Sequence, residues 1–402
     1  MKAEAALLLL CARACLSPDQ RISLDALLKE RLDWDLILQL VERHGLAPLL
    51  QRHLGACEAG AIPKDVSAYL WARHEARVRR NQELAAELVA IVAHLDSHGI
   101  KVVPYKGPTL ALSAYGDLSL REFGDLDLLV RSGDAIKAKE LLVSSGYVPE
   151  IALSAGLEEA LVRSLRHYEL PLRDPSRRML VELHWRSDPE FEVARLGDPG
   201  WWADLEAIEL CGATLPALPA RELLLILCLH GTKHFWASLG WLVDVAELMA
   251  RAQPPDWEWI VATAGRLGAE RHLGVGLSLA CSLLQAPLPE VARGILADAE
   301  VVACVQSIRA DLFDPAYRPW TVRKALGQNL RLHRAWSARV RYLLRVAFTP
   351  SVGEWQRWPL PLPLFFLYYP LRLARLAEKY LLRRIPPAAT PRTPPPPRHS
   401  TD

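Results

Sequence analysis

Two aspartates, Asp125 and Asp127, stand two residues apart in the segment Asp-Leu-Asp-Leu-Leu-Val. Because side chains alternate between the two faces of a β-strand, both carboxylates would project from one face, roughly 7 Å apart at about 3.3 Å rise per residue. Mg²⁺ binds through one or two carboxylates together with phosphate oxygens and water. Two such ions can stabilise the attacking and the leaving oxygen of a phosphoryl displacement. The spacing therefore indicates a metal-dependent phosphoryl-transfer site.

A candidate phosphate-binding turn precedes the aspartates. Residues 100–103 have the apolar character of a short strand, and Gly107 follows it. A glycine lets a phosphate approach the backbone, and Lys106 would offer it positive charge. Residues 110–115 have helical spacing, and Arg121 stands just before the aspartates. Each piece alone is also typical of a turn or a solvated strand edge, but their order favours a nucleotide site.

The order Lys-Gly, Tyr, Arg and Asp-Leu-Asp-Leu-Leu-Val resembles the uncharacterised bacterial nucleotidyltransferases of the DNA polymerase beta-like nucleotidyltransferase superfamily. In that superfamily a third carboxylate arrives on a later strand, and the resemblance points to Glu182 for this position. Strand alternation separates Glu182 and His184 from Val181 and Leu183. The alternative is that Glu182 is a plain exposed strand carboxylate.

One position departs from the superfamily pattern. Where the superfamily has a serine after its glycine, this chain has Pro108, which offers a phosphate neither an amide hydrogen nor a hydroxyl. Thr109 is the expected substitute. Gly107 and Thr109 would then border the phosphates, while Lys106 and Arg121 would neutralise charge on the α-phosphate and the pyrophosphate.

A second similarity to this family lies in residues 223–234 and 239–246. Four residues match the family pattern there: His230, His234, Trp241 and Asp244. His230 and His234 are four apart and share a helix face, so a metal pair is one interpretation. The residues between them lack the glutamate of a zinc protease, which favours a packed helix face with hydrogen-bonded histidines. His184, His230, His234 and Asp244 are therefore accessory candidates.

Composition narrows the class of protein. The chain has 402 residues and is 51% apolar, enough for two or three domains with a core. A formal net charge of +2 is too small for a general nucleic-acid binder. Seven cysteines without paired spacing indicate reduced cytoplasmic thiols. The N-terminus resembles a signal peptide, but Glu4 and Arg13 favour a buried first helix over export or lipid attachment at Cys15.

Hydrophobic periodicity predicts an α+β chain in which a small sheet domain is flanked by N-terminal and C-terminal helical domains. The resemblance implies that the sheet domain is a mixed-sheet nucleotidyltransferase domain. The expected parts are an N-terminal helical region at 1–94, the catalytic domain at 95–190, a C-terminal helical domain at 215–346, an apolar and basic amphipathic segment at 347–385 and a disordered Pro-rich tail at 386–402. Strands are expected near Lys101, Asp125 and Leu180. Turns are expected at Pro216 and Pro219.

The segment 358–384 has a membrane-surface character. Its first part, up to Leu371, is uncharged and apolar but shorter than the roughly 20 residues that a spanning helix needs. The basic residues that follow on an amphipathic helix are Arg372, Arg375, Lys379, Arg383 and Arg384. Peripheral contact with an anionic membrane is one interpretation, and packing against the helical domain is the other.

Together these features predict a cytoplasmic enzyme that transfers a nucleoside monophosphate from an NTP, expected to be ATP, and releases pyrophosphate. Its acceptor could be a protein, an RNA end or a small molecule. Asp125 and Asp127 would hold two Mg²⁺, with Mn²⁺ as the alternative, and Glu182 would complete the metal shell or accept a proton. Two other classes stay open: a nucleotide-binding protein without chemistry, and a membrane-peripheral assembly protein of a cell-surface or peptide biosynthetic pathway.

Overall fold

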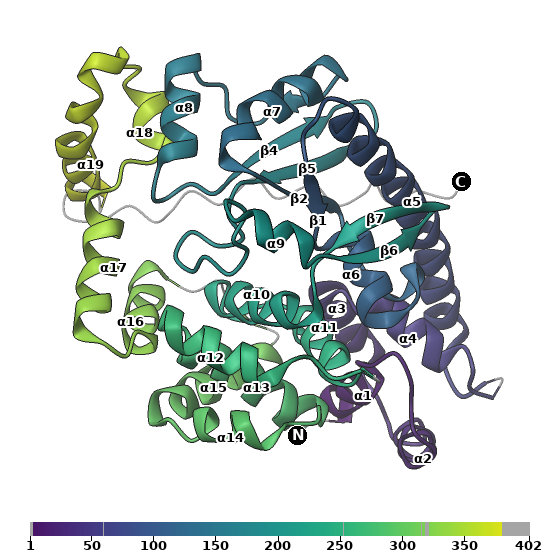
Figure 1. Ribbon diagram of the computed structural model, residues 1–402. Coiled ribbons are helices and arrows are strands. Elements are labelled where there is room, and N and C mark those ends of the chain that lie inside the picture. The colour runs from purple at the N-terminus through teal and green to yellow at the C-terminus, as the bar shows by residue number, and fades with distance from the viewer. Residues whose placement is uncertain (1–2, 59, 252, 315, 318–320, 380–402) are drawn as a thin grey trace. The chain divides into compact units, whose positions relative to one another are not determined.

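The computed structural model describes residues 3–58, 60–251, 253–314, 316–317 and 321–379 (Figure 1). The chain divides into two compact units, Met1–Tyr342 and Leu343–Asp402. The finer domain boundaries predicted within the first unit stay predictions. The tail predicted at 386–402 lies outside the described residues.

The first unit contains a five-stranded mixed sheet in the order β1-β2-β5-β4-β3. The strands are β1 (Val102–Pro104), β2 (Asp125–Val130), β3 (Val148–Pro149), β4 (Glu169–Asp174) and β5 (Met179–His184). The β2 and β5 strands pair in parallel, and the other neighbours pair antiparallel. The predicted α+β class with a small mixed sheet and flanking helices is confirmed. Strands β3 and β4 were not predicted.

A separate hairpin joins β6 (Glu206–Leu210) to β7 (Ala213–Ala217). Cys211 and Gly212 form its turn with φ angles of 51° and 78°, the sign that a tight two-residue hairpin requires at both positions. Pro216 lies inside β7, opposite Ala207, so the predicted turn at Pro216 is wrong. A two-stranded sheet has only edge strands, and an edge strand tolerates a proline because its missing amide need not pair.

Helices surround the sheet and continue after it. Those before the sheet are α1 (Ala3–Cys11), α2 (Pro18–Leu27), α3 (Trp34–His44), α4 (Ala47–Leu54) and α5 (Lys64–Ser97). Those within and beside it are α6 (Gly107–Leu110), the π-helix η1 (Ala111–Tyr115), the 3₁₀-helices η2 (Leu118–Leu120) and η3 (Ser132–Asp134), α7 (Ala135–Ser144), α8 (Ala155–Arg163) and α9 (Pro199–Ala203). Those after it are α10 (Ala220–Lys233), α11 (Leu239–Met249), α12 (Trp257–Leu267), α13 (Glu270–Leu284), α14 (Glu290–Leu296), α15 (Ala299–Leu312), α16 (Val322–Leu332) and α17 (Trp336–Phe348), which runs into the second unit.

Helix α5 holds the segment that leads into β2. The Asn81 side-chain amide donates to the carbonyl oxygens of Leu118 and Arg121, at 2.6 and 2.9 Å. The Arg77 guanidinium donates to the Phe123 carbonyl oxygen at 3.2 Å and to Glu122 Oε2 at 3.1 Å. These bonds fix the backbone just before the first aspartate of β2.

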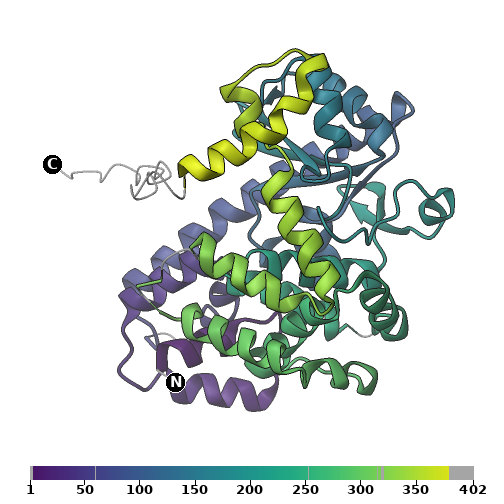
Figure 2. The ribbon, with the colours of Figure 1, turned by 90° about the vertical axis from the view of Figure 1, so that its left-hand side faces the viewer.

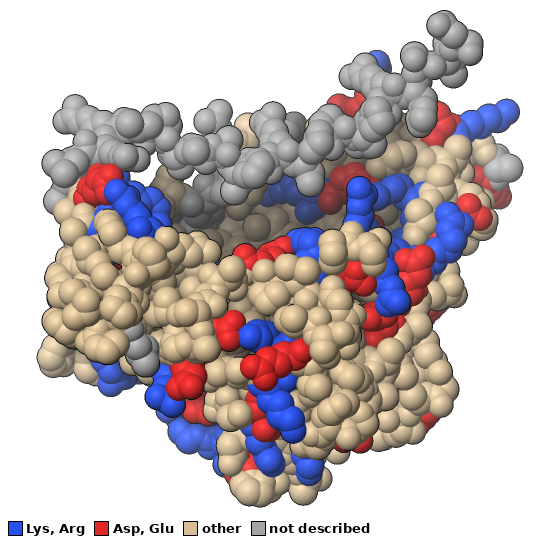
Figure 3. Space-filling view, turned by 90° about the horizontal axis from the view of Figure 1, so that it is seen from above, with Lys and Arg blue, Asp and Glu red and all other residues tan. Residues whose placement is uncertain are grey.

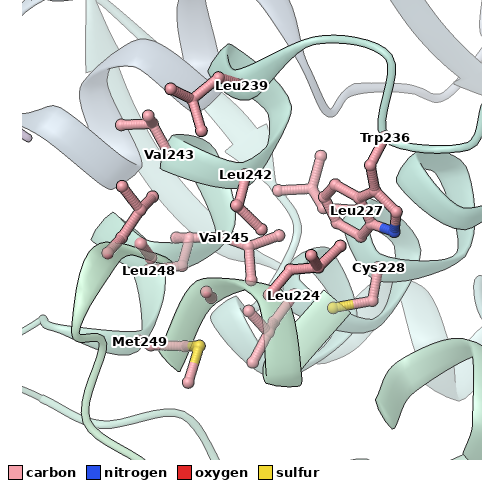
Figure 4. Packing of buried hydrophobic residues seen from close by; sticks show 14 of the residues in the cluster. Leu224, Leu227, Cys228, Trp236, Leu239, Leu242, Val243, Val245, Leu248 and Met249 are labelled. Atoms are coloured by element: carbon pink, nitrogen blue, oxygen red, sulfur yellow. The ribbon is translucent and has the colours of Figure 1, made fainter. Parts of the chain in front are cut away.

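One hydrophobic cluster joins the N-terminal helices to α10–α15, and the two groups lie side by side in Figures 1 and 2. Figure 4 shows its centre, where Leu224, Leu227 and Cys228 of α10 pack near Leu242 and Val245 of α11. Burying such side chains contributes roughly 1.5–3 kcal/mol each. The packing sets the position of α10 and α11 relative to each other.

A buried histidine ties α3 to this C-terminal group. His44 Nδ1 accepts a hydrogen bond from the Leu239 amide at 3.1 Å, and its Nε2 lies 3.1 Å from the Leu312 carbonyl oxygen. The amide requires a lone pair on Nδ1, so the proton sits on Nε2 and the ring is neutral. A neutral imidazole thus bridges the start of α11 and the end of α15.

His44 should make stability depend on pH. Burial, reinforced by Arg43, lowers the pKa of His44 to about 4 from 6.5. The unfolded chain binds this proton at a higher pH than the folded chain, so the contribution is complete above pH 6.5 and is lost as pH falls towards 4. The loss is on the order of 3 kcal/mol, at about 1.4 kcal/mol for each pH unit between the two values.

We expect the thermal unfolding midpoint of the wild-type chain to fall as the pH is lowered from 6.5 to 4. The midpoint of His44→Gln should fall less over the same range, and calorimetry between about pH 4 and 7.5 measures both. His98→Gln, at an exposed position after α5, is the matched control and should keep the wild-type slope. An unchanged slope in His44→Gln would contradict the assignment.

The second unit contains α18 (Val352–Arg357), the 3₁₀-helix η4 (Leu362–Leu367) and α19 (Tyr368–Ala377). Glu354 is fully buried and binds Arg372 Nη1 at 3.2 Å and Arg375 Nη1 at 2.7 Å. On the membrane interpretation these two arginines would face lipid headgroups, whereas in the structure both bind an internal carboxylate. Phe366 and Tyr369 are exposed, at 62% and 47%.

The membrane contact predicted for 358–384 stays a prediction, and residues 380–384 lie outside the described part. Among the described helices, none has the length and apolar character to cross a bilayer. On the face drawn in Figure 3, acidic and basic side chains are intermingled, in keeping with a formal net charge of +2.

Candidate functional site

Two parallel strands bring the predicted carboxylates together. Asp127 of β2 lies opposite Glu182 of β5 in the strand register. Asp125 precedes Asp127 by two residues and therefore shares its sheet face, while Leu126 and Leu128 point to the other face and are fully buried. The apolar face anchors the strand in the core. The opposite face presents three acids.

A histidine lies among these acids. His184 Nε2 is 3.2 Å from Asp127 Oδ1 and 3.5 Å from Glu182 Oε2. The ligand atoms of these three residues all lie within 4.8 Å of one another. Glu169 of β4, opposite His184 in the register, places Oε2 3.4 Å from His184 Nδ1. The group is thus built from three adjacent strands.

These side chains border a cavity of about 390 Å³, in the size range of small-molecule sites. Its lining comprises Tyr105, Lys106, Arg121, Glu122, Phe123, Gly124, Asp125, Asp127, Tyr168, Glu169, Glu182, His184, Ser187, His230, Lys233, His234 and Trp241. Eight predicted site residues are among them. Gly107, Thr109 and Asp244 are buried and do not line the cavity.

Lys106 follows β1 and forms an ion pair inside the cavity, with Nζ 2.8 Å from Asp127 Oδ1. Burial alone would lower the pKa of Lys106, but Asp127 outweighs it and raises this pKa. Burial alone would raise the pKa of Asp127, but Lys106 and His184 hold it well below its usual range. The pair is therefore ionised at neutral pH.

Asp125 is in a different electrostatic state. Burial, together with the neighbouring charges of Asp127 and Glu182, raises the pKa of Asp125 to about 6. Ionising all the acids at once is therefore costly in the absence of a further cation. A divalent cation would relieve this repulsion, because it favours the charged form of each carboxylate.

Gly107 and Thr109 shape the turn that carries Lys106. Gly107 has φ +53°, and a Cβ placed there would lie 3.1 Å from the Asp125 carbonyl oxygen. The glycine thus allows the turn to pack against the β2 backbone. Thr109 Oγ1 donates to the Lys106 carbonyl oxygen at 2.9 Å. The hydroxyl expected to face a phosphate is thus engaged within the turn.

Arg121 and Asp244 form a buried two-bond ion pair. Arg121 Nε is 2.9 Å from Asp244 Oδ1, and Nη2 is 3.0 Å from Oδ2. The Tyr115 hydroxyl donates to the same Oδ1 at 2.7 Å. Arg121 Nη1 is buried without a hydrogen-bond partner. The pair joins the segment before β2 to α11 and leaves one guanidinium nitrogen uncommitted.

Helices α10 and α11 form the opposite wall. The rings of His230 and His234 lie 4.6 Å apart, and their centroids are 5.4 and 5.7 Å from that of Trp241. Burial, with Lys106 nearby, lowers the pKa of His230 well below its usual value, so this ring is neutral. The predicted packed helix face agrees with these ring contacts. The rings also face the cavity.

The family model described as "Uncharacterised nucleotidyltransferase" matches residues 30–285. The chain belongs to this family. The match spans the whole cavity lining, and it confirms the resemblance noted in the sequence. No curated protein matches the chain. The chain is similar to the crystal structure of an antigenic nucleotidyltransferase-like protein from Paracoccidioides brasiliensis, which is 16% identical over 52% of this chain and 94% of that one, with a TM-score of 0.33.

In this nucleotidyltransferase-family chain, the sequence alone did not indicate several cavity residues, among them Tyr105, Tyr168, Glu169 and Lys233. Lys233 Nζ donates to the Tyr168 hydroxyl at 2.6 Å and lies 4.3 Å above that ring. Lys233 stands between His230 and His234 in the sequence, so its position in the family motif could have indicated that it lines the cavity. No sequence feature indicated this for Tyr168 and Glu169, because β4 was not predicted.

The residues present fit a divalent cation. Asp127, Glu182 and His184 are the described residues whose ligand atoms cluster closely enough to hold one. Both ring nitrogens of His184 are buried and lack an aligned hydrogen bond, although carboxylate oxygens lie within ion-pair distance. Buried polar atoms without partners are rare in native proteins. A bound cation would satisfy the side of the ring that faces the acids.

Proposed function

We propose that this chain is a Mg²⁺-dependent nucleotidyltransferase that transfers a nucleoside monophosphate, expected to be AMP, from an NTP to an acceptor and releases pyrophosphate. The family supports nucleotidyl transfer. The observation that carries the assignment to these residues is the pairing of Asp127 with Glu182 on parallel strands that face a cavity. In this proposal the acceptor is a protein hydroxyl, an RNA end or a small molecule.

Asp125, Asp127 and Glu182 are the proposed metal-holding residues. A bound divalent cation would supply charge stabilisation for the attacking and leaving oxygens. In the reaction, an acceptor oxygen bonds to the α-phosphorus, the bond to the bridging oxygen breaks and pyrophosphate leaves. Glu182, which is less buried than Asp127, is placed to accept the acceptor's proton.

In this proposal the side chains of Lys106 and Arg121 balance the phosphate charge. Lys106 lies beside Asp127, and the uncommitted Nη1 of Arg121 belongs to a side chain that lines the same cavity. Donors held in position by the fold stabilise developing charge without reorganisation at the moment of reaction. Asp244 would hold the Arg121 guanidinium still while this nitrogen contacts a phosphate oxygen.

Lys106→Met should raise the KM for NTP by about tenfold or more, with a smaller change in kcat. A tenfold rise is about the loss in binding that follows when one charge-assisted hydrogen bond is removed. Because Lys106 also neutralises Asp127, the variant should need less Mg²⁺ for half-maximal activity. Steady-state kinetics over a grid of NTP and Mg²⁺ concentrations separates the two effects. Unchanged values of both would show that Lys106 only supports the turn.

The proposal is tested by incubating the purified chain with Mg²⁺ and each α-labelled NTP, with cell extract as the acceptor source. Pyrophosphate release and transfer of label are followed together. The control is the double variant Asp125→Asn/Asp127→Asn. Label that depends on the intact aspartates supports transfer. Stoichiometric nucleotide binding without pyrophosphate release would instead support the nucleotide-binding alternative.

A further inference from the structure

His184 is a buried imidazole enclosed by acids. Its side chain is 1% exposed, and its two nitrogens face different carboxylates. Nε2 faces Asp127 and Glu182, and Nδ1 faces Glu169. None of these contacts has the alignment of a hydrogen bond. The ring is therefore directed at the acids from ion-pair distance.

The separations of His184 Nε2 from the two carboxylate oxygens are close to those between ligand atoms that share one cation. Ligand atoms about 2.1 Å from a cation are separated by about 3.0 Å at adjacent octahedral positions and by about 3.4 Å at tetrahedral ones. His184 Nε2 lies 3.2 Å from Asp127 Oδ1 and 3.5 Å from Glu182 Oε2. The ligand atoms of all three residues lie within 4.8 Å of one another, so one cation could contact all three after the side chains adjust.

Glu169 completes an arrangement that is common around metal-binding histidines. Such a histidine usually directs its other ring nitrogen at a carboxylate or carbonyl, which fixes the tautomer and the ring plane. Glu169 Oε2 is 3.4 Å from His184 Nδ1. Tyr105 and Tyr168 contact the ring, with centroids at 5.4 and 5.8 Å, and limit its rotation.

We propose that His184 Nε2 binds the divalent cation directly, beside Asp127 and Glu182, and that the site selects Mn²⁺ over Mg²⁺. Imidazole nitrogen is a common ligand of transition-metal ions, whereas carboxylate and water suit both Mn²⁺ and Mg²⁺. As a transition-metal ion, Mn²⁺ accepts a nitrogen ligand more readily than Mg²⁺ does, so the imidazole shifts the preference of this oxygen-rich site towards Mn²⁺. Glu169 acts as a positioning residue that orients the ring. This inference rests on the proposed function, and in it Mn²⁺ replaces Mg²⁺ as the preferred ion of that same site.

The test uses the full chain with Mn²⁺ alone. Pulsed electron paramagnetic resonance should detect coupling between bound Mn²⁺ and an imidazole nitrogen, and calorimetry should give an affinity about tenfold or more above that for Mg²⁺. His184→Asn should lose the coupling and bind Mn²⁺ about 10- to 100-fold more weakly, with a smaller change for Mg²⁺. Glu169→Gln should weaken Mn²⁺ binding by about tenfold, as outer-shell changes do.

His234→Asn is the matched control, because it removes an imidazole from the same cavity but outside the cluster, and it should keep the coupling. Bound Mn²⁺ without nitrogen coupling in the wild-type chain would overturn the inference, and so would coupling that survives in His184→Asn or no binding at millimolar Mn²⁺. If the chain binds Mn²⁺ with nitrogen coupling but never transfers label, the proposed function is contradicted and the inference is not. If it transfers label without the coupling, only the inference is contradicted.

Discussion

Asp127→Asn is expected to abolish nucleotidyl transfer, with kcat at least about a thousandfold below wild type. Asp127 is the centre of the acidic group. Its side chain forms ion pairs with Lys106 and His184, and it lies opposite Glu182 in the strand register. The amide keeps the shape but loses the charge that would hold a cation. A thousandfold loss corresponds to about 4 kcal/mol of transition-state stabilisation, within the several kcal/mol that a catalytic metal supplies.

The measurement is initial-rate release of pyrophosphate at saturating NTP and Mg²⁺, with thermal unfolding to show that the variant folds. Asp96→Asn makes the same chemical change at an exposed position near the end of α5 and should retain full activity. Removing metal with a chelator should reproduce the loss in the wild-type chain. Turnover within tenfold of wild type would remove Asp127 from the site.

The two strands that carry the acids could be predicted because polar and apolar residues alternate around the acids, in Asp125–Leu128 of β2 and in residues 181–184 of β5. Leu126 and Leu128 lie on the buried side of β2, and Val181 and Leu183 do the same on β5. Alternation assigns faces within a strand but does not give the partner of a strand. The register of Asp127 opposite Glu182 joins segments far apart in the chain. Only the family resemblance indicated that the two belong together.

Strand β4 shows where pattern reasoning fails. Its sequence, Glu-Leu-Pro-Leu-Arg-Asp, contains Pro171 and three charged residues, which are depleted from strands in general. The tertiary pairing with β5 overrides this weak propensity. Glu169 and Tyr168 were therefore absent from the predicted site, although both line the cavity.

The sequence did not indicate the local contacts of several candidate residues. Gly107 and Thr109 were expected to border a phosphate, and the structure places them inside the turn that carries Lys106. Asp244 was assigned from the family pattern alone, and the sequence did not indicate what it binds. In the structure it binds Arg121, which is more than a hundred residues away in sequence, so periodicity within α11 could not reveal the pair.

That pair carries the largest expected effect on stability. Asp244→Leu should lower the free energy of unfolding by about 3–5 kcal/mol, because it leaves the Arg121 charge buried and unpaired. Both side chains are nearly inaccessible, with 2% and 12% exposed. Tyr115→Phe removes only a hydroxyl that donates to the same carboxylate, and should cost about 1 kcal/mol.

The double variant Arg121→Met/Asp244→Leu separates a lost charge pair from lost packing. Replacing both partners removes the uncompensated charge, so the double variant should be more stable than Asp244→Leu. Chemical denaturation followed by tryptophan fluorescence measures the cycle. A double variant no better than the single one would mean that the ion pair is incidental. Its predicted rescue of stability should not extend to transfer activity, because the Arg121 nitrogen proposed to face the phosphates is absent from it.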